Sequence, residues 1–333
     1  MIRVRQPGMQ TTVQDLGRPT WQHVGVPVGG AMDPQAHRIA NLLIGNAPDA
    51  ATLECALGGV AVQFTTTALV ALAGRDISAS LDGTPIGPWR AIRVERGAML
   101  ALHTGCRTTI AIAGGIDVPV VLNARGTSLR AAFGGWQGRA LRRDDELPIG
   151  RPSALADRIR EHLVDARRTI APWGAGPDLV PAYAGAPTVR IIEGPQLAEL
   201  DDASRALLLG ATFRVAPDSD RMGYRLAGHA LSLRTPREMV SSGVTAGTIQ
   251  LPPGGAPIVL MADRQTTGGY PRLGDVITVD LPLLAQLRAG DSVRFALTTL
   301  EVAQSQYRRT EHELSRAQRA IQLRFAAGAD GTY

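Results

Sequence analysis

The most chemically rich stretch of this chain is residues 261–271, which read Met-Ala-Asp-Arg-Gln-Thr-Thr-Gly-Gly-Tyr-Pro. It supplies an acid, a base, an amide, two hydroxyls, a phenol and two adjacent glycines. The run just before it, residues 257–261, is apolar and β-branched, which is typical of a buried strand. Loops at the end of a rigid strand often carry function, so we interpret this loop as part of a site rather than as a self-solvating turn. Asp263 is the best candidate for proton transfer there, provided that it is buried.

Other polar side chains follow predicted strands in the second half of the chain. They come from residues 218–225, from residues 241–250 and from the loop just described. The members of this group are Asp220, Arg221, Gln250, Asp263, Arg264 and Gln265. For Asp220 and Arg221 the alternative interpretation is a structural turn with an aspartate cap.

A second polar group lies near the start of the chain, where residues 11–18 contain Gln14, Asp15 and Arg18. An amide, a carboxylate and a guanidinium in one turn-like stretch could orient a small substrate that bears a carboxylate or an amide. The alternative is a surface ion pair between Asp15 and Arg18, which stabilises a protein by ~1 kcal/mol or less. Spacing alone does not decide between them. Asn41 is likewise either an exposed residue or a substrate contact.

Glycine clusters mark a third region, residues 113–139. Arg125, Thr127 and Arg139 lie beside Gly-Gly or Gly-Thr elements whose backbone N–H groups could cradle an anion such as phosphate. The alternative is a set of tight barrel corners, where glycine permits sharp bends. Corners explain the glycines but not the arginines that recur beside them.

All 35 basic residues are arginine, and the chain contains no lysine. A Walker-type phosphate loop and a Schiff-base lysine are therefore excluded. The chain cannot itself be a biotin or lipoyl carrier either, because both groups are attached through a lysine amine. Any anion clamp must use arginine, backbone N–H groups or helix N-termini.

The composition of the 333 residues, 44% hydrophobic and 20% charged, is that of an ordinary globular protein with room for two cores. We see no signal peptide and no apolar run of ~20 residues, so we expect a cytoplasmic protein without membrane contact. A net charge of +5, with arginines interleaved with acids, and only 4% aromatics argue against nucleic-acid binding. The histidines lack metal-ligand spacing, so no metal site is expected, and Cys55 and Cys106 are predicted to be buried thiols.

Short strand-like runs bounded by Gly, Pro or Asp dominate the chain and favour β-barrel or sandwich domains. One late example is residues 276–279. Helices are predicted at residues 34–44, 196–209, 282–287 and 301–324. The first of them has Asp33 as N-cap and Pro34 at its first position.

A change to Pro- and Gly-rich sequence predicts the domain boundary. We expect an N-terminal β-barrel domain at residues 1–150, a linker with a helical segment at 151–187, a C-terminal β-barrel domain at 188–298, and a helical tail at 299–333. A weak echo between the halves, each with a strand, a Gly-Gly turn and an arginine-containing loop, suggests two similar β-domains.

Several motifs resemble those of the biotin-dependent carboxyltransferase-like family, which includes 5-oxoprolinase C subunits, KipA and allophanate hydrolase subunit 2. The resemblance covers nearly all of residues 3–295. It rests on residues 11–18, 29–33, 40–46, 219–226, 247–250 and 262–271. The chain departs from the family pattern at Gly126, Asp144 and Ser242, which leaves the exact substrate open.

The resemblance implies a mainly β (α+β) fold with two cyclophilin-like β-barrel domains, a few short helices and a C-terminal helical tail. By motif match it also implies a set of residues that line the site, without assigning their individual catalytic roles. Among them we expect Asp15, Arg221 and Asp263 to be the candidates for catalysis, and Arg18, Asn41, Asp220, Gln250, Gln265 and Tyr270 to be those for substrate binding.

The function that the resemblance implies is the ATP-dependent opening of 5-oxo-L-proline to L-glutamate, with a KipI-like (PxpB) sister subunit and a PxpA-like subunit. The lactam carbonyl would be activated by phosphorylation from ATP, with or without Mg²⁺, and the chain would be inactive alone. One alternative is a carboxyltransferase component that acts on urea or a related amide and needs a separate biotin carrier. Another is a regulatory protein that sequesters its KipI-like sister.

Overall fold

The computed structural model describes residues 1–235 and 239–326, and in it the chain forms two compact units. The first unit comprises residues 1–17, residues 33–181 and the chain from Glu311 onward. The second unit comprises residues 18–32 and 182–310. Neither unit is a single continuous stretch of sequence.

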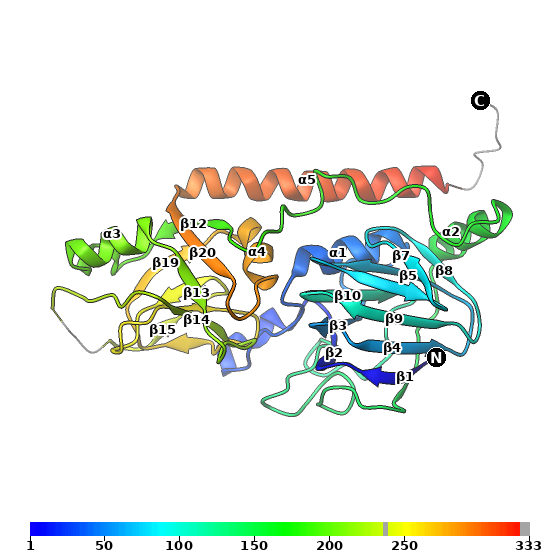
Figure 1. Ribbon diagram of the computed structural model, residues 1–333, viewed down its shortest axis with the longest axis horizontal. Helices are drawn as coiled ribbons and strands as arrows, with labels where there is room; N and C mark the ends of the chain where they lie inside the picture. Colours follow the sequence, from blue (N-terminus) through cyan, green and yellow to red (C-terminus); the bar gives the residue numbers. More distant parts are fainter. Residues whose placement is uncertain (236–238, 327–333) are drawn as a thin grey trace. The chain divides into compact units, whose positions relative to one another are not determined.

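The first unit is built from two antiparallel sheets (Figure 1). Their strand orders are β11-β1-β4-β9-β6-β7 and β2-β3-β10-β5-β8. The strands are β1 (Ile2–Pro7), β2 (Gln10–Gln14), β3 (Thr52–Ala56), β4 (Val60–Phe64), β5 (Ala68–Ala73), β6 (Ser78–Leu81), β7 (Thr84–Ile86), β8 (Ile92–Val94), β9 (Met99–Thr104), β10 (Arg107–Ile112) and β11 (Glu146–Leu147). Apolar residues from both sheets, such as Val62 of β4 and Val70 of β5, share one buried core.

Strand β5 is covered on both faces, and its sequence shows why. All six of its residues, Ala-Leu-Val-Ala-Leu-Ala, are apolar and buried. Val70 and Leu72 belong to the core shared by the two sheets. Leu69 and Ala71 belong to a second core, which includes the apolar face of α1 (Pro34–Leu43).

Helix α1 begins as its sequence predicts. Asp33 accepts a hydrogen bond from the Ala36 N–H at 2.9 Å, and Pro34 occupies the first turn. The same core also contains residues of α2 (Ala154–Asp165) and of the second half of α5 (Leu300–Arg324). A bidentate ion pair between Arg38 and Glu311, with distances of 2.6 and 2.7 Å, adds a polar contact to this packing.

The second unit contains a closed barrel with the strand order β12-β19-β16-β17-β14-β13-β20. Its strands are β12 (Thr188–Glu193), β13 (Phe213–Val215), β14 (Gly223–Ala227), β16 (Thr248–Gln250), β17 (Ile258–Leu260), β19 (Arg272–Val276) and β20 (Ser292–Leu297). The remaining elements are η1 (Pro19–Val24), η2 (Leu197–Glu199), α3 (Asp202–Gly210), η3 (Thr278–Asp280), α4 (Leu281–Ala285) and the pair β15 (Ser242–Gly243) and β18 (Thr267–Gly268). The barrel closes through the parallel pairing of β12 with β20. Phe213, Ile249 and Phe295 lie in its core.

The predicted mainly β class, with few helices and a C-terminal helix, is confirmed. Barrel closure occurs in the second unit, whereas the strands of the first unit form two sheets. Cys55 and Cys106 are buried free thiols, as predicted. Within residues 1–235 and 239–326, no helix is long and apolar enough to cross a membrane.

Two predicted elements are wrong. Residues 276–279 do not form a strand of their own: Val276 ends β19, and the chain then turns into η3, where Asp280 accepts hydrogen bonds from the backbone N–H and the guanidinium of Arg190. The helix predicted at 196–209 is split. Asp201 is extended and caps α3 by accepting the Ser204 N–H at 2.6 Å, so only η2 precedes it.

A buried polar network lies beneath α1. His37 bonds to the Thr52 hydroxyl at 3.1 Å through Nδ1 and to the Asn41 amide at 3.2 Å through Nε2. Asn41 also donates to the Ala50 carbonyl at 2.9 Å and accepts from Asn46 at 2.9 Å. Burial lowers the pKa of His37 from 6.5 to about 4, so the ring is neutral in the folded protein at neutral pH.

This lowered pKa predicts a loss of stability in mild acid. A histidine whose folded pKa lies below its unfolded value takes up a proton on unfolding, so the folded state loses stability as the pH falls from 6.5 toward about 4. Between pH 7 and pH 5 the loss through His37 is about 2 kcal/mol. In urea denaturation, His37→Gln should reduce the difference in unfolding free energy between these pH values by that amount. The exposed His312→Gln should leave the difference unchanged, and an unchanged difference in His37→Gln would contradict the assignment.

Candidate functional site

The loop after β17 is held by backbone hydrogen bonds from both sides. The N–H groups of Met261 and Asp263 donate to the carbonyls of Met222 and Arg221, at 2.9 and 2.8 Å. The Gly29 N–H donates to the Ala262 carbonyl at 3.1 Å. The turn before β14 and the segment around Gly29 therefore fix where the side chains of this loop begin.

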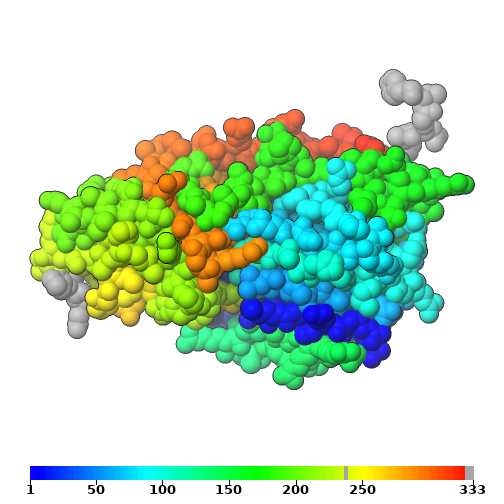
Figure 2. Space-filling model, viewed as in Figure 1, coloured from blue at the N-terminus to red at the C-terminus, as the bar shows by residue number. Residues whose placement is uncertain are grey.

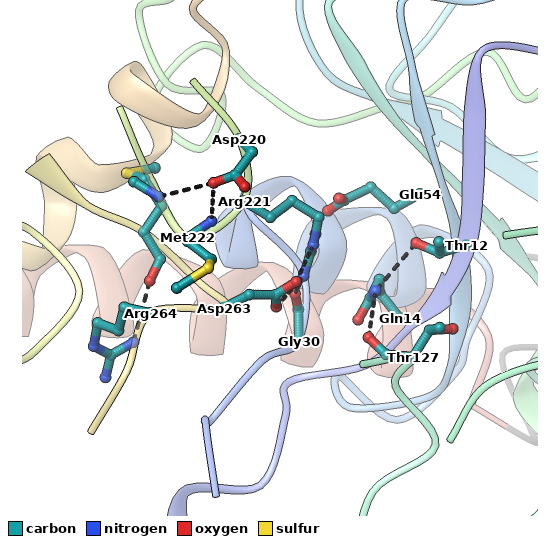
Figure 3. A network of polar contacts seen from close by, with 12 residues as sticks. Thr12, Gln14, Gly30, Glu54, Thr127, Asp220, Arg221, Met222, Asp263 and Arg264 are labelled. Atoms are coloured by element: carbon teal, nitrogen blue, oxygen red, sulfur yellow. Dashed lines mark hydrogen bonds and ion pairs between the residues drawn. The ribbon is translucent and has the colours of Figure 1, made fainter. Parts of the chain in front are cut away.

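Arg221 and Asp263 form a bidentate ion pair in the second unit (Figure 3). Nε of Arg221 lies 2.8 Å from one carboxylate oxygen, and Nη2 lies 2.9 Å from the other. Nη2 also donates to the Gly30 carbonyl at 2.6 Å. Arg221 is 6% exposed, so the pair is shielded from water and its geometry is defined by charge-assisted hydrogen bonds. Both oxygens of Asp263 are thereby engaged as acceptors.

Arg18 lies close to Asp263 and belongs to residues 18–32, the N-terminal segment of the second unit. It is buried, and a Cβ atom added at Gly29 would lie 3.6 Å from its Nη1 and 3.7 Å from Oδ1 of Asp263. Gly29 itself has φ +64°, which favours glycine. The structure thus brings Arg18, Arg221 and Asp263 together around one glycine turn.

Asp220 shapes the turn that presents Arg221. Its Oδ1 accepts the N–H groups of Met222 at 2.7 Å and Gly223 at 3.3 Å (Figure 3). This is the aspartate-capped turn that the sequence left open as an alternative.

Gln250 and Gln265 lie beside each other, with Nε2 of Gln265 3.4 Å from Oε1 of Gln250. Gln250 is 2% exposed, and its own Nε2 has no hydrogen-bond partner among the described residues. A Cβ atom at Gly268 would lie only 2.3 Å from that nitrogen, so a larger residue there would displace the Gln250 amide. Tyr270 is 45% exposed and lines a mainly apolar cavity of about 420 Å³ together with Leu233 and other residues of the second unit.

The first unit holds its own polar group around Asp15. This carboxylate accepts the N–H of Gly17 at 2.8 Å and the N–H of Arg125. The Arg125 guanidinium pairs with Asp117 at 2.9 Å and donates to a backbone carbonyl. The Thr127 hydroxyl donates to the Val13 carbonyl at 2.9 Å. Asp15, Arg125 and Thr127 are therefore neighbours, and each has a structural partner.

Two predicted site residues lie apart from these groups. Arg139 forms a bidentate pair with Asp145, with distances of 2.7 and 2.8 Å. Their hydrogen bonding raises the pKa of Arg139 and lowers the pKa of Asp145, so both groups are charged and mutually neutralised. Asn41 belongs to the buried network beneath α1.

The sequence does not predict the roles of the Gly30 carbonyl and of Arg264. A backbone carbonyl can accept a hydrogen bond whatever the residue type, so the sequence does not mark it. Arg264 stands out in the sequence only as one polar residue of the loop, although a guanidinium that is buried is usually paired. In the part of the chain that the structure describes, no group of three or more His, Cys, Asp or Glu residues could hold a metal ion.

Comparison with known proteins agrees with this architecture. A family model described as "Carboxyltransferase domain, subdomain A and B" matches residues 24–297. The C subunit of 5-oxoprolinase from Escherichia coli is 38% identical over 309 residues, which cover 91% of this chain and 93% of that protein. The protein of the same name from Haemophilus influenzae is 32% identical and is covered over 99% of its length.

Larger proteins contain a similar region. The urea amidolyase of Lachancea kluyveri is 29% identical over 319 residues, but this chain spans only 17% of it. The crystal structure of the K. lactis urea amidolyase superposes with a TM-score of 0.85 at 25% identity, covering 95% of this chain and 20% of that one. The crystal structure of TTHA0988 has a TM-score of 0.74 at 30% identity, covering 89% of this chain and 55% of that one.

The matched residues and the 38% identity to a relative of nearly equal length lead to one conclusion. The chain belongs to the carboxyltransferase-domain family with subdomains A and B, as its sequence motifs indicated.

Proposed function

We propose that this chain is a subunit of an ATP-dependent 5-oxoprolinase, which opens 5-oxo-L-proline to L-glutamate together with a KipI-like (PxpB) and a PxpA-like subunit. The observation that carries the proposal is the match to 5-oxoprolinase C subunits over 93% and 99% of their lengths. The urea amidolyases are matched over a small part of theirs. We place this complex in the cytoplasm and regard the isolated chain as inactive.

The geometry suits a lactam substrate. Opening the ring requires the carbonyl oxygen to be polarised, and fixed cationic donors stabilise the negative charge that develops there. Arg221 is a fixed donor group of this kind, because Asp263 and the Gly30 carbonyl hold its guanidinium in one orientation. Asp263 also offsets its charge, as Asp145 does for Arg139. In this proposal Asp263 positions Arg221, and Arg18 adds a second guanidinium beside Gly29.

Arg125 and Arg139, which the sequence suggested as phosphate-binding residues, are poorly suited to bind ATP. Arg139 is neutralised by Asp145, and Arg125 pairs with Asp117. The chain also lacks lysine. We therefore assign the ATP site to a partner subunit and derive no step through ATP from the residues described here.

A second candidate function is carboxyl transfer to urea or a related amide. It is supported by the TM-score of 0.85 to the K. lactis urea amidolyase over 95% of this chain. Because the chain has no lysine, that reaction would require a separate biotin carrier.

The first test is reconstitution. When the purified chain is mixed with its two partner subunits, adding 5-oxo-L-proline should stimulate ADP release, and omitting this chain should abolish the stimulation. The measurement is a coupled ADP assay with glutamate detection. Absence of 5-oxo-L-proline-dependent turnover would contradict the proposal, and inhibition by avidin would favour the carboxyl-transfer function.

The second test removes the support of Arg221. Asp263→Asn keeps the size of the side chain but loses the charge and one acceptor, so Arg221 is left partly unpaired in a shielded site. We expect kcat in the reconstituted assay to fall at least about 100-fold, since loss of an oriented donor typically has an effect of that order.

The matched control is Asp218→Asn. Asp218 pairs with Arg225 at 3.1 Å, but both side chains are more than half exposed, so its loss should leave kcat close to that of the wild type. If Asp263→Asn is folded, by circular dichroism and thermal denaturation, and fully active, the assignment of this site is wrong.

A further inference from the structure

Arg264 is a buried guanidinium without a counterion among the residues that the structure describes. It is 7% exposed, and the hydrogen bond found for it joins Nη1 to the Met261 carbonyl at a long 3.4 Å. Its Nε is buried and has no acceptor. Within residues 1–235 and 239–326, no carboxylate lies within ion-pair distance of it. In Figure 3 the carboxylates of Asp220 and Asp263 both lie away from its guanidinium.

Other arginines with little or partial exposure are paired with carboxylates. Arg221 has Asp263 and Arg107 has Glu54, and the partly exposed Arg190 has Asp280. The directions of the two pKa shifts differ in the same way. The bond to Asp280 raises the pKa of Arg190, whereas burial lowers the pKa of Arg264 with no opposing charge. A buried cation without a partner opposes folding, so its retention needs an explanation.

The loop does not allow Arg264 to relax toward solvent by shifting its backbone. The backbone N–H of Arg264 donates to the Met261 carbonyl at 3.3 Å, and the backbone N–H of Asp263 donates to the Arg221 carbonyl at 2.8 Å. The next residue, Gln265, reaches Gln250, which carries a second buried donor without an acceptor at Nε2. Among the described residues, two buried donors thus lack acceptors: Nε of Arg264, and Nε2 of Gln250, which contacts the neighbouring loop residue Gln265.

We infer that Arg264 binds the carboxylate of a small anionic amide. A planar guanidinium matches a carboxylate through paired hydrogen bonds, and the negative charge supplies the missing counterion. A neutral amide such as urea offers acceptors but no charge. Arg264 is therefore a specificity-determining residue that favours a carboxylate-bearing lactam. This inference rests on the proposed function for the identity of the amide.

The test compares a charged and a neutral lactam in the three-subunit assembly. Arg264→Gln should raise KM for 5-oxo-L-proline by about 100-fold, because the site loses its partner for a buried charge. The variant should retain its kcat/KM for 2-pyrrolidinone, which lacks the carboxylate. The ratio of kcat/KM for 5-oxo-L-proline to that for 2-pyrrolidinone should therefore fall by about the same factor. Arg264→Lys should recover part of the preference because it keeps the charge without the planar fork.

Thermal denaturation of the full chain supplies a readout besides activity. Without ligand, Arg264→Gln should melt no lower than the wild type, since it removes an uncompensated buried charge. The stabilisation of the wild type by 5-oxo-L-proline should be lost in the variant. The control Arg214→Gln removes an exposed arginine of β13 and should change neither melting temperature nor KM. A lower melting temperature in Arg264→Gln with unchanged KM would show a purely structural role and overturn the inference.

Failure of the proposed function can be told apart from failure of this inference. If the wild-type assembly does not turn over 5-oxo-L-proline, the proposed function fails. The full chain is then titrated with acetate, glutarate and inorganic phosphate in the thermal assay. Stabilisation of the wild type by acetate or glutarate, but not of Arg264→Gln, would support carboxylate binding at Arg264. A response to phosphate alone, or to none of the three, would overturn it.

Discussion

The ion pair between Arg221 and Asp263 is the interaction on which the candidate site depends. It connects the turn before β14 to the exit of β17, and the same guanidinium also holds the carbonyl of Gly30. Three segments distant in sequence therefore meet at one side chain. The first unit likewise brings distant segments together, and in the space-filling view its blue N-terminal segment lies directly against a green segment (Figure 2). Only a planar cation with several donors can make these bonds simultaneously, and a chain without lysine uses arginine at every such position. Because the pair is shielded, neither partner can change alone without leaving a charge uncompensated.

The sequence located the polar loop of this candidate site better than it located the partners of the loop's side chains. A polar loop after a buried apolar strand is a local pattern, and residues 261–265 follow β17 as expected. The closeness of Arg221 to Asp263 follows from the antiparallel pairing of Gly223 with Leu260, which is a nonlocal property. For the same reason, the partners of Arg139 and Asn41 could not be foreseen, since local spacing does not show which buried groups satisfy a polar side chain.

The fold shows the same division between local and tertiary signals. Helix α1 has an N-cap, a proline and a periodic apolar face, and it forms where predicted. The turn at η3 depends on Asp280 binding Arg190 of the neighbouring strand β12, which lies 90 residues away in the sequence. Likewise, closure of the second unit depends on the parallel pairing of β12 with β20, strands separated by most of that unit.

The discontinuity of the two units has a consequence for synthesis of the chain. The helical core of the first unit includes Leu314 and Phe325, which leave the ribosome only after the whole second unit has been translated. The sheets of the first unit can pair early, but the apolar face that these residues cover stays open until the segment after Glu311 has been translated. The nascent chain must therefore carry a partly covered first unit while the second unit is being synthesised.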